Sequence, residues 1–127
     1  MYVGDVNGTA GLARLNVTAH LGDGNDSFLS NHYGDQLGTT QVNLSVFGEG
    51  GNDTLRVLAT NGVDIGPNGR LTVTLDGGAG NDYLEARYAG ELDGLLNLTL
   101  RGRDGNDTIR ASAVKYSGST GSIQGFI

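Results

Sequence analysis

The stretch GGAGNDYLE, residues 77–85, contains three glycines, then an Asn-Asp pair, and then one apolar residue, Leu84, between polar ones. Three glycines within four positions favour a tight turn, because glycine adopts positive φ angles that other residues avoid. The turn presents a single carboxylate, that of Asp82. The stretch therefore predicts a glycine-rich turn built around one acidic side chain.

The same turn recurs along the chain. Gly-Asn-Asp occurs four times, and its aspartates are 27, 29 and 25 residues apart. These aspartates are Asp26, Asp53, Asp82 and Asp107. Each copy lies in the same surroundings, as in LNVTAHLGDGNDSFLS (residues 15–30) and LTVTLDGGAGNDYLEA (residues 71–86). A repeat of this length indicates stacked supersecondary units that bury their apolar faces against one another.

The segments on both sides of each turn alternate between apolar and polar residues. Before Asp82 the apolar residues are Leu71, Val73 and Leu75, and after it they are Leu84, Ala86 and Tyr88. A period of two is typical of strands, and no window favours a helix of useful length. We therefore predict an all-β fold, a right-handed parallel β-solenoid of about four coils with 25–29 residues in each coil.

Stacking of the coils would bring the four aspartates into one column. Neighbouring strands lie about 4.8 Å apart, and at an effective dielectric constant near 20 each adjacent pair of carboxylates repels by roughly 3 kcal/mol. Such a column requires cations or protons. Carboxylate and carbonyl oxygens, with no histidine or cysteine in the motif, favour Ca²⁺ over zinc or copper.

The motif resembles a known family. GGAGNDYLE matches in full the G-G-x-G-x-D-x-U-x nonapeptide of the RTX (repeats-in-toxin) calcium-binding β-roll proteins. GEGGNDTLR (residues 48–56) and GRDGNDTIR (residues 102–110) have Glu49 and Arg103 in place of the second glycine. LGDGNDSFL (residues 21–29) has Leu21 in place of the first.

The resemblance implies about three Ca²⁺ ions, held between the turns of adjacent coils. The implied side-chain ligands are Asp26, Asp53, Asp82 and Asp107, and the implied carbonyl ligands lie near Gly24, Gly50, Gly51, Gly77, Gly80 and Gly105. It also implies a secreted bacterial protein that stays disordered until it meets extracellular calcium.

One feature departs from that family. Its nonapeptides run in tandem and give calcium turns on both edges of an 18-residue coil, whereas this chain has one nonapeptide in each longer coil. On the opposite edge Asp64 and Asp93 align while Asp35 does not, and we interpret these three as solubilising loop residues. Four further acids adjoin the turns and are either auxiliary ligands or solvated side chains: Asp23, Glu49, Asp76 and Asp104.

Composition excludes several classes of protein. The chain has 127 residues, predicted to form one domain over residues 1–127, with a net charge of −6 and no cysteine. An acidic chain disfavours a nucleic-acid partner, and no apolar stretch is long enough to span a membrane. His20 and His32 do not recur in other repeats and are interpreted as surface residues. No catalytic constellation is visible, so we predict that the protein is not an enzyme.

The two ends of the sequence fit the same repeat. An ungapped alignment places Met1 where a motif aspartate belongs and Ile123 where Leu98 lies. We therefore expect the chain to be part of a longer array, which also accounts for the lack of a visible signal peptide.

The expected function is that of a calcium-binding structural module of a secreted or cell-surface protein, folding on Ca²⁺ binding. Its partners would be calcium ions and neighbouring repeats of the parent chain. Two alternatives remain: an accessory module of a secreted enzyme, and a ligand-binding face for ice or carbohydrate. The second rests on outward polar pairs in each strand before the turn: Asn16 and Thr18, Asn43 and Ser45, Thr72 and Thr74, Asn97 and Thr99.

Overall fold

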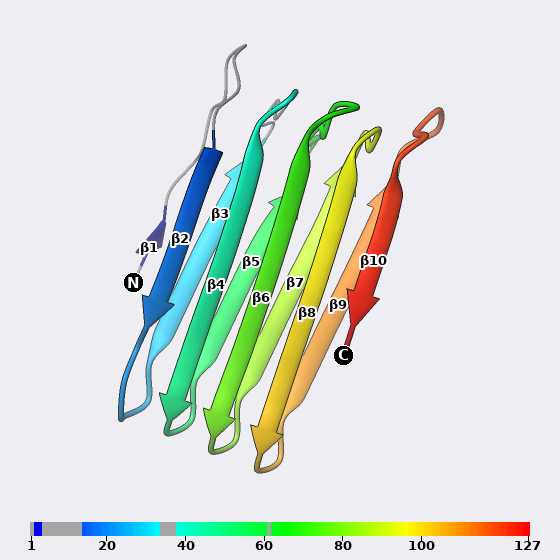
Figure 1. Ribbon diagram of the computed structural model, residues 1–127. Coiled ribbons are helices and arrows are strands. Elements are labelled where there is room, and N and C mark those ends of the chain that lie inside the picture. The colour runs from blue at the N-terminus through cyan, green and yellow to red at the C-terminus, as the bar shows by residue number, and fades with distance from the viewer. Residues whose placement is uncertain (1, 4–13, 34–37, 61) are drawn as a thin grey trace.

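The structure of the chain, a computed structural model, describes residues 2–3, 14–33, 38–60 and 62–127. Two parallel sheets face each other, and the chain alternates between them (Figure 1). The odd sheet contains β1 (Tyr2–Val3), β3 (Ser27–Tyr33), β5 (Thr54–Thr60), β7 (Tyr83–Gly90) and β9 (Thr108–Lys115). The even sheet contains β2 (Arg14–His20), β4 (Gln41–Gly50), β6 (Arg70–Ala79), β8 (Leu95–Asp104) and β10 (Ser122–Phe126).

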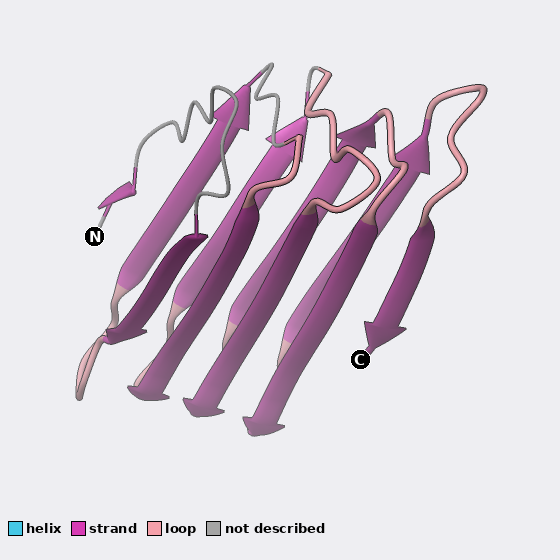
Figure 2. Cartoon of the chain, turned by 45° about the horizontal axis from the view of Figure 1, so that its top comes forward, coloured by secondary structure: helices cyan, strands magenta, loops and turns pink. Residues whose placement is uncertain are grey.

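This arrangement is a parallel β-solenoid of about four coils with two strands in each, and the described residues contain no helix. The predicted fold class is therefore confirmed. Short turns connect even strands to odd strands at one edge, and longer loops return the chain at the opposite edge (Figure 2).

The pairing register follows the spacing of the motif. Ser27 pairs with Thr54, Thr54 with Tyr83, and Tyr83 with Thr108, which reproduces the steps between the aspartates. The alignment of the C-terminal end was wrong by two residues, because Ile123 pairs with Leu96 instead of Leu98. The loop between β9 and β10 is two residues longer than the loop between β7 and β8, and ladder pairing does not restrict loop length. Met1 lies outside the described residues.

The core is the thin layer between the two sheets. The predicted inward residues on both sides of the third turn are all buried, from Leu71, Val73 and Leu75 in β6 to Leu84, Ala86 and Tyr88 in β7. Equivalent residues of successive coils stack upon one another, since each strand pairs in register with the next. The sheets thereby hold all four Asn-Asp turns along a single edge.

The interpretation of His32 as a surface residue was wrong. Its exposed fraction is 2%, and its Nε2 atom lies 2.9 Å from Oγ of Ser30. In β3, Phe28, Ser30 and His32 alternate with outward residues, so period two directs the imidazole into the core. His20 is exposed, as expected, and stacks on the ring of Phe47.

Candidate metal centre

The turns between the two sheets share one backbone conformation. Their fourth nonapeptide residues, Gly24, Gly51, Gly80 and Gly105, have φ angles of 125°, 124°, 141° and 129°. The second position is also left-handed, at Gly22 and Gly78 and at the two non-glycine residues Glu49 and Arg103, whose φ angles are 77° and 78°. Gly50 and Gly77 do not adopt positive φ, so conformational freedom does not explain these two glycines.

Close packing between coils explains the invariant fourth glycine. A Cβ atom on Gly51 would overlap the carbonyl oxygen of Gly24, and one on Gly80 would overlap that of Gly51. Gly105 stands in the same relation to Gly80. The turns therefore stack backbone against backbone along the edge, which brings their polar groups together.

The motif aspartates link each coil to the one before it. The backbone N–H of Asp26 donates to Oδ1 of Asp53 at 2.8 Å, and the N–H of Asp53 donates to Oδ1 of Asp82 at 2.8 Å. The N–H of Asp82 donates to Oδ1 of Asp107 at 2.9 Å. The four aspartates therefore form the expected column, in which one oxygen of each carboxylate after the first already has a backbone partner.

The preceding asparagines form a second ladder in the opposite direction. The side-chain oxygen of Asn25 accepts from the N–H of Asn52 at 2.8 Å, and that of Asn52 accepts from the N–H of Asn81 at 2.7 Å. Asn81 accepts in the same way from Asn106. We did not predict this role, although the recurrence of asparagine at the same position in all four copies was a signal for it.

The other oxygen of the carboxylates is left without a partner. Oδ2 of Asp26, Asp53 and Asp82 is buried and has no hydrogen-bond donor in the structure. A buried carboxylate oxygen without a partner is strongly destabilising, since its hydration is lost with nothing in return. Asp82 is only 2% exposed. Burial raises the pKa of its carboxyl, as do the charges of Asp53, Asp107 and Asp76, while the hydrogen bond from Asp53 opposes them.

The first glycine of the nonapeptide leaves space for these oxygens. A Cβ atom on Gly48 would overlap both Oδ2 of Asp53 and the carbonyl oxygen of Gly77. A Cβ atom on Gly77 would overlap Oδ2 of Asp82, and one on Gly102 would overlap Oδ2 of Asp107. Gly48 and Gly102 were missing from the predicted site, although alignment with Gly77 identifies both.

These groups fit Ca²⁺. In the described part of the chain, no three side chains of Asp, Glu, His or Cys gather closely enough to hold a metal ion by themselves. A bound cation would therefore depend on carbonyl oxygens as well as on the column of carboxylates, and an all-oxygen set of this kind suits calcium. The carbonyl of Gly50 already accepts a hydrogen bond from Gly24 at 2.7 Å, whereas that of Gly77 converges with Oδ2 of Asp53.

The acids next to the turns differ from one another. Asp76 is buried and forms a two-pronged ion pair with the guanidinium of Arg103, with 2.6 Å between Nη2 and Oδ2, so it is not a solvated side chain. Glu49 pairs with His20 at 2.8 Å. Asp23 and Asp104 are exposed.

The opposite edge also carries cross-coil contacts. Oδ1 of Asp64 accepts from the N–H of Glu91 at 3.2 Å. Oδ1 of Asp93 accepts from the N–H and the hydroxyl of Thr120, each at 2.9 Å. Both aspartates therefore hold loops of adjacent coils together. The predicted alignment of Asp64 with Asp93 was wrong, because the bridge between Ile65 and Leu92 places Asp64 opposite Glu91. Asp35 lies outside the described residues.

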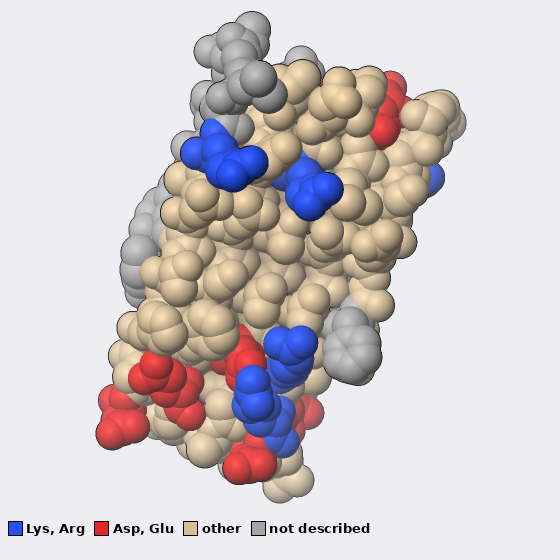
Figure 3. All heavy atoms as spheres, in the orientation of Figure 1, with Lys and Arg blue, Asp and Glu red and all other residues tan. Residues whose placement is uncertain are grey.

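The outer face of the even sheet carries the polar rows that the sequence suggested. Asn16, Asn43, Thr72 and Asn97 pair in one row, and Thr18, Ser45, Thr74 and Thr99 pair in another. Figure 3 shows an uncharged band across the middle of this face, with charged residues near both ends. The next row, from His20 and Phe47 to Asp76 and Arg101, is irregular.

Comparison with known proteins agrees with this geometry. The RTX calcium-binding nonapeptide repeat (4 copies) matches residues 45–62, 73–87 and 99–113. These segments contain Asp53, Asp82 and Asp107 but not Asp26. Neither the curated proteins nor the solved structures provided a significant match. The described residues include no helix that is long and apolar enough to cross a membrane. The three matched segments show that this β-solenoid carries RTX calcium-binding nonapeptide repeats.

Proposed function

We propose that this solenoid is a structural module of a secreted or cell-surface protein and that it folds when it binds calcium. RTX nonapeptide repeats bind calcium and belong to a structural repeat family, and proteins that carry them are generally secreted bacterial proteins. The observation that carries the proposal is the column of buried Oδ2 atoms at Asp26, Asp53 and Asp82, none of which has a partner.

In this proposal three ions occupy the gaps between the four turns. Bound calcium supplies the positive charge that offsets the stacked carboxylates. The side-chain ligands are Asp26, Asp53, Asp82 and Asp107. The backbone ligands come from the turn glycines: Gly24, Gly51, Gly77, Gly80 and Gly105 of the predicted set, with Gly50 replaced by the first-position glycines Gly48 and Gly102.

The energetic argument concerns the state without calcium. Each unpaired carboxylate oxygen destabilises the folded chain, and neighbouring carboxylates repel each other at strand spacing. The core that opposes these effects is a single layer between two sheets. The free energy of calcium binding then appears as free energy of folding, because the unfolded chain has no assembled site.

Circular dichroism tests the proposal. We expect the β-sheet signal to disappear when EGTA removes calcium and to return when calcium is added in excess. Magnesium is the matched control, because its small octahedral shell suits this set of carbonyl ligands poorly. An unchanged spectrum and melting temperature in EGTA would show that calcium does not drive folding.

A further inference from the structure

The outer face of the odd sheet is positively charged although the chain as a whole has a net charge of −6. The described strands of this sheet, β3, β5, β7 and β9, contain four basic residues and one acidic residue. These are Arg56, Arg87, Arg110, Lys115 and Glu85. We call Arg56, Arg87 and Arg110 the arginine face.

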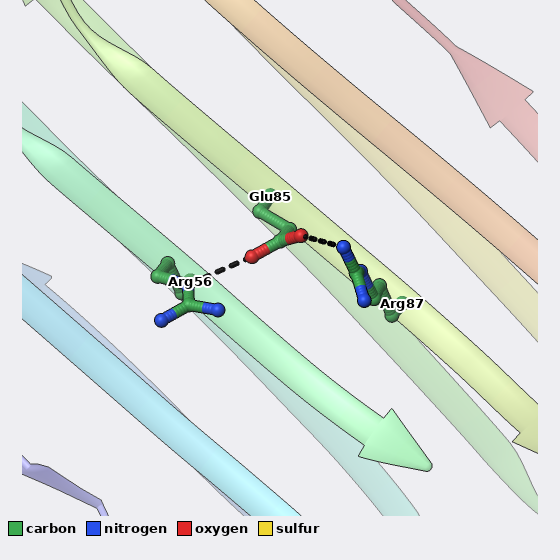
Figure 4. Close-up of polar contacts among 3 residues, drawn as sticks. All are labelled: Arg56, Glu85 and Arg87. Atoms are coloured by element: carbon green, nitrogen blue, oxygen red, sulfur yellow. Dashed lines mark hydrogen bonds and ion pairs between the residues drawn. The ribbon is translucent and has the colours of Figure 1, made fainter.

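Glu85 holds two of these arginines in place. Its side chain is 1% exposed although it lies on the outer side of the sheet, because the arginines cover it. Nε of Arg56 donates to Oε2 of Glu85 at 2.7 Å, and Nη2 of Arg87 lies 2.7 Å from Oε1 (Figure 4). One carboxylate balances only one of two guanidinium charges, and each guanidinium has five N–H donors.

The third arginine is not part of this cluster. Arg110 pairs with Glu85 in the backbone register, yet its guanidinium lies over the ring of Tyr83, 5.7 Å from the ring centroid. The side chains of Arg56 and Arg87 are 38% and 50% exposed. All three guanidiniums are therefore accessible and fixed on adjacent strands, and their charge exceeds that of Glu85 by two.

A hollow lies beside two of these residues. Its volume is about 490 Å³, and Arg87, Arg110 and Ser112 line it together with Ile109, Ala111 and Ile127. Guanidinium and hydroxyl donors around one hollow suit a negatively charged oxygen group, since guanidinium binds carboxylate and sulfate-type groups through paired N–H donors.

We propose that the arginine face binds an acidic polysaccharide, with its carboxylate or sulfate groups against Arg56, Arg87 and Arg110. Hydroxyl side chains at outward positions of the same strands, including Thr54, Thr108 and Ser112, supply hydrogen bonds for sugar hydroxyls. A nucleic acid fits less well, because Arg110 already covers the ring of Tyr83 on which a base would stack. This inference is independent of the proposed calcium function.

Binding of defined polymers to the full chain tests the inference. Dextran sulfate and polygalacturonate are the two polyanions, neutral dextran is the blank, and calcium is kept at one fixed concentration. We expect binding to at least one polyanion and none to dextran. Dextran sulfate alone would identify sulfate as the recognised group, and polygalacturonate alone would identify carboxylate.

Two double variants separate the arginine face from net charge. Arg87→Gln with Arg110→Gln should weaken binding at least about tenfold, the loss expected for two charge-assisted contacts. Arg14→Gln with Arg70→Gln, on the even sheet, changes the net charge equally and should weaken binding less than about twofold. The single variant Arg110→Gln leaves both ion pairs of Glu85 intact. Its loss of binding should be smaller than that of the double variant, and this loss cannot be attributed to misfolding around Glu85.

Equal losses in the two double variants would overturn the inference, as would the absence of binding to both polyanions. Tighter binding of single-stranded DNA than of either polysaccharide would also overturn it, by assigning the face to nucleic acid. Circular dichroism of each variant verifies that the solenoid remains folded.

Discussion

At the scale of single residues, each nonapeptide position has its own physical reason. The fourth glycine is needed for its φ angle and, from the second copy on, for the space between coils, whereas the first is needed for space alone. The second is needed for its φ angle, and at Gly78 for space as well, because a Cβ atom there would overlap the carbonyl oxygen of Glu49. Glu49 and Arg103 adopt that left-handed conformation with full side chains, and both contact the preceding coil, Glu49 through His20 and Arg103 through an ion pair with Asp76. These contacts offset part of the strain, which explains why these two copies tolerate the loss of the consensus glycine.

Substitution should cost more stability at a glycine that needs both positive φ and space than at a glycine that needs positive φ alone. Gly51→Ala should lower the free energy of unfolding by about 3 kcal/mol or more, since its Cβ atom would overlap the backbone of Gly24. Gly22→Ala is the matched control, because it has positive φ but no atom within 4 Å of the added Cβ atom, and should cost about 1 kcal/mol. Denaturant unfolding at saturating calcium measures both, and equal losses would contradict the packing argument.

The position of an aspartate in the column should decide how much its loss costs. Asp82 lies between two turns that carry aspartates, whereas Asp26 has only one such neighbour among the described residues. Asp82→Ala should therefore lose more bound calcium and more stability than Asp26→Ala. Calorimetric titration measures the bound calcium. Asn52→Ala is a control that removes a ladder contact without removing a carboxylate, and equal losses for the two aspartates would indicate independent sites.

The predictable part of the site follows from repetition. Glycine spacing and the four aspartates established the column, because equivalent residues of a solenoid must lie side by side. The hydrogen bond that the carbonyl of Gly50 accepts from the N–H of Gly24 and the burial of Asp76 were not foreseen. Both depend on contacts between coils, with Gly24 and with Arg103, that are not encoded in the motif itself.

At the scale of strands, period two predicted which residues face the core and which face outward. The exceptions are polar residues whose environment depends on neighbours one coil away. His32 follows the inward pattern despite its polarity, and Glu85 follows the outward pattern yet is buried beneath arginines from β5 and β7. The sequence of β7 alone does not reveal that Glu85 is covered, because one of the covering side chains, that of Arg56, lies 29 residues earlier in the chain.

The Glu85 cluster predicts a dependence of stability on pH. Burial alone would raise the pKa of Glu85, but the hydrogen bond and charge of Arg56, with those of Arg87, outweigh it and lower the pKa below its ordinary value of 4.5. A lowered folded-state pKa stabilises the fold above the unfolded pKa, and this contribution disappears as pH falls through the folded-state value.

Glu85→Gln should accordingly destabilise the protein by about 2 kcal/mol at pH 7, since it removes charge-assisted hydrogen bonds. The difference from the unsubstituted protein should shrink as the pH falls below about 4.5. Denaturant unfolding at several pH values, with calcium in excess, measures this difference. Arg70→Gln on the even sheet provides a control that leaves Glu85 intact, and a difference independent of pH would contradict the role of the ion pair.

At the scale of the whole molecule, the solenoid behaves as a one-dimensional stack. Every described strand except those at the ends pairs with the strand one coil before it and the strand one coil after it. Each gap between turns is completed only when both adjacent coils are ordered, because the carboxylate of one coil bonds to the backbone of the coil before it. Order in one coil therefore favours order in the next.

This coupling predicts cooperative calcium binding with a stoichiometry of about three ions per chain. The first ion must order two coils, whereas later ions extend an existing stack and lose less conformational entropy. A titration followed by calorimetry and by circular dichroism should therefore give a sigmoidal curve, with the β-sheet signal rising in step with bound calcium. The Asp82→Ala variant should interrupt the stack in its middle and flatten the curve, while Asp26→Ala should shorten the stack and leave the rest cooperative. A hyperbolic curve with four equivalent sites would instead mean that each turn binds its own ion without help from its neighbour.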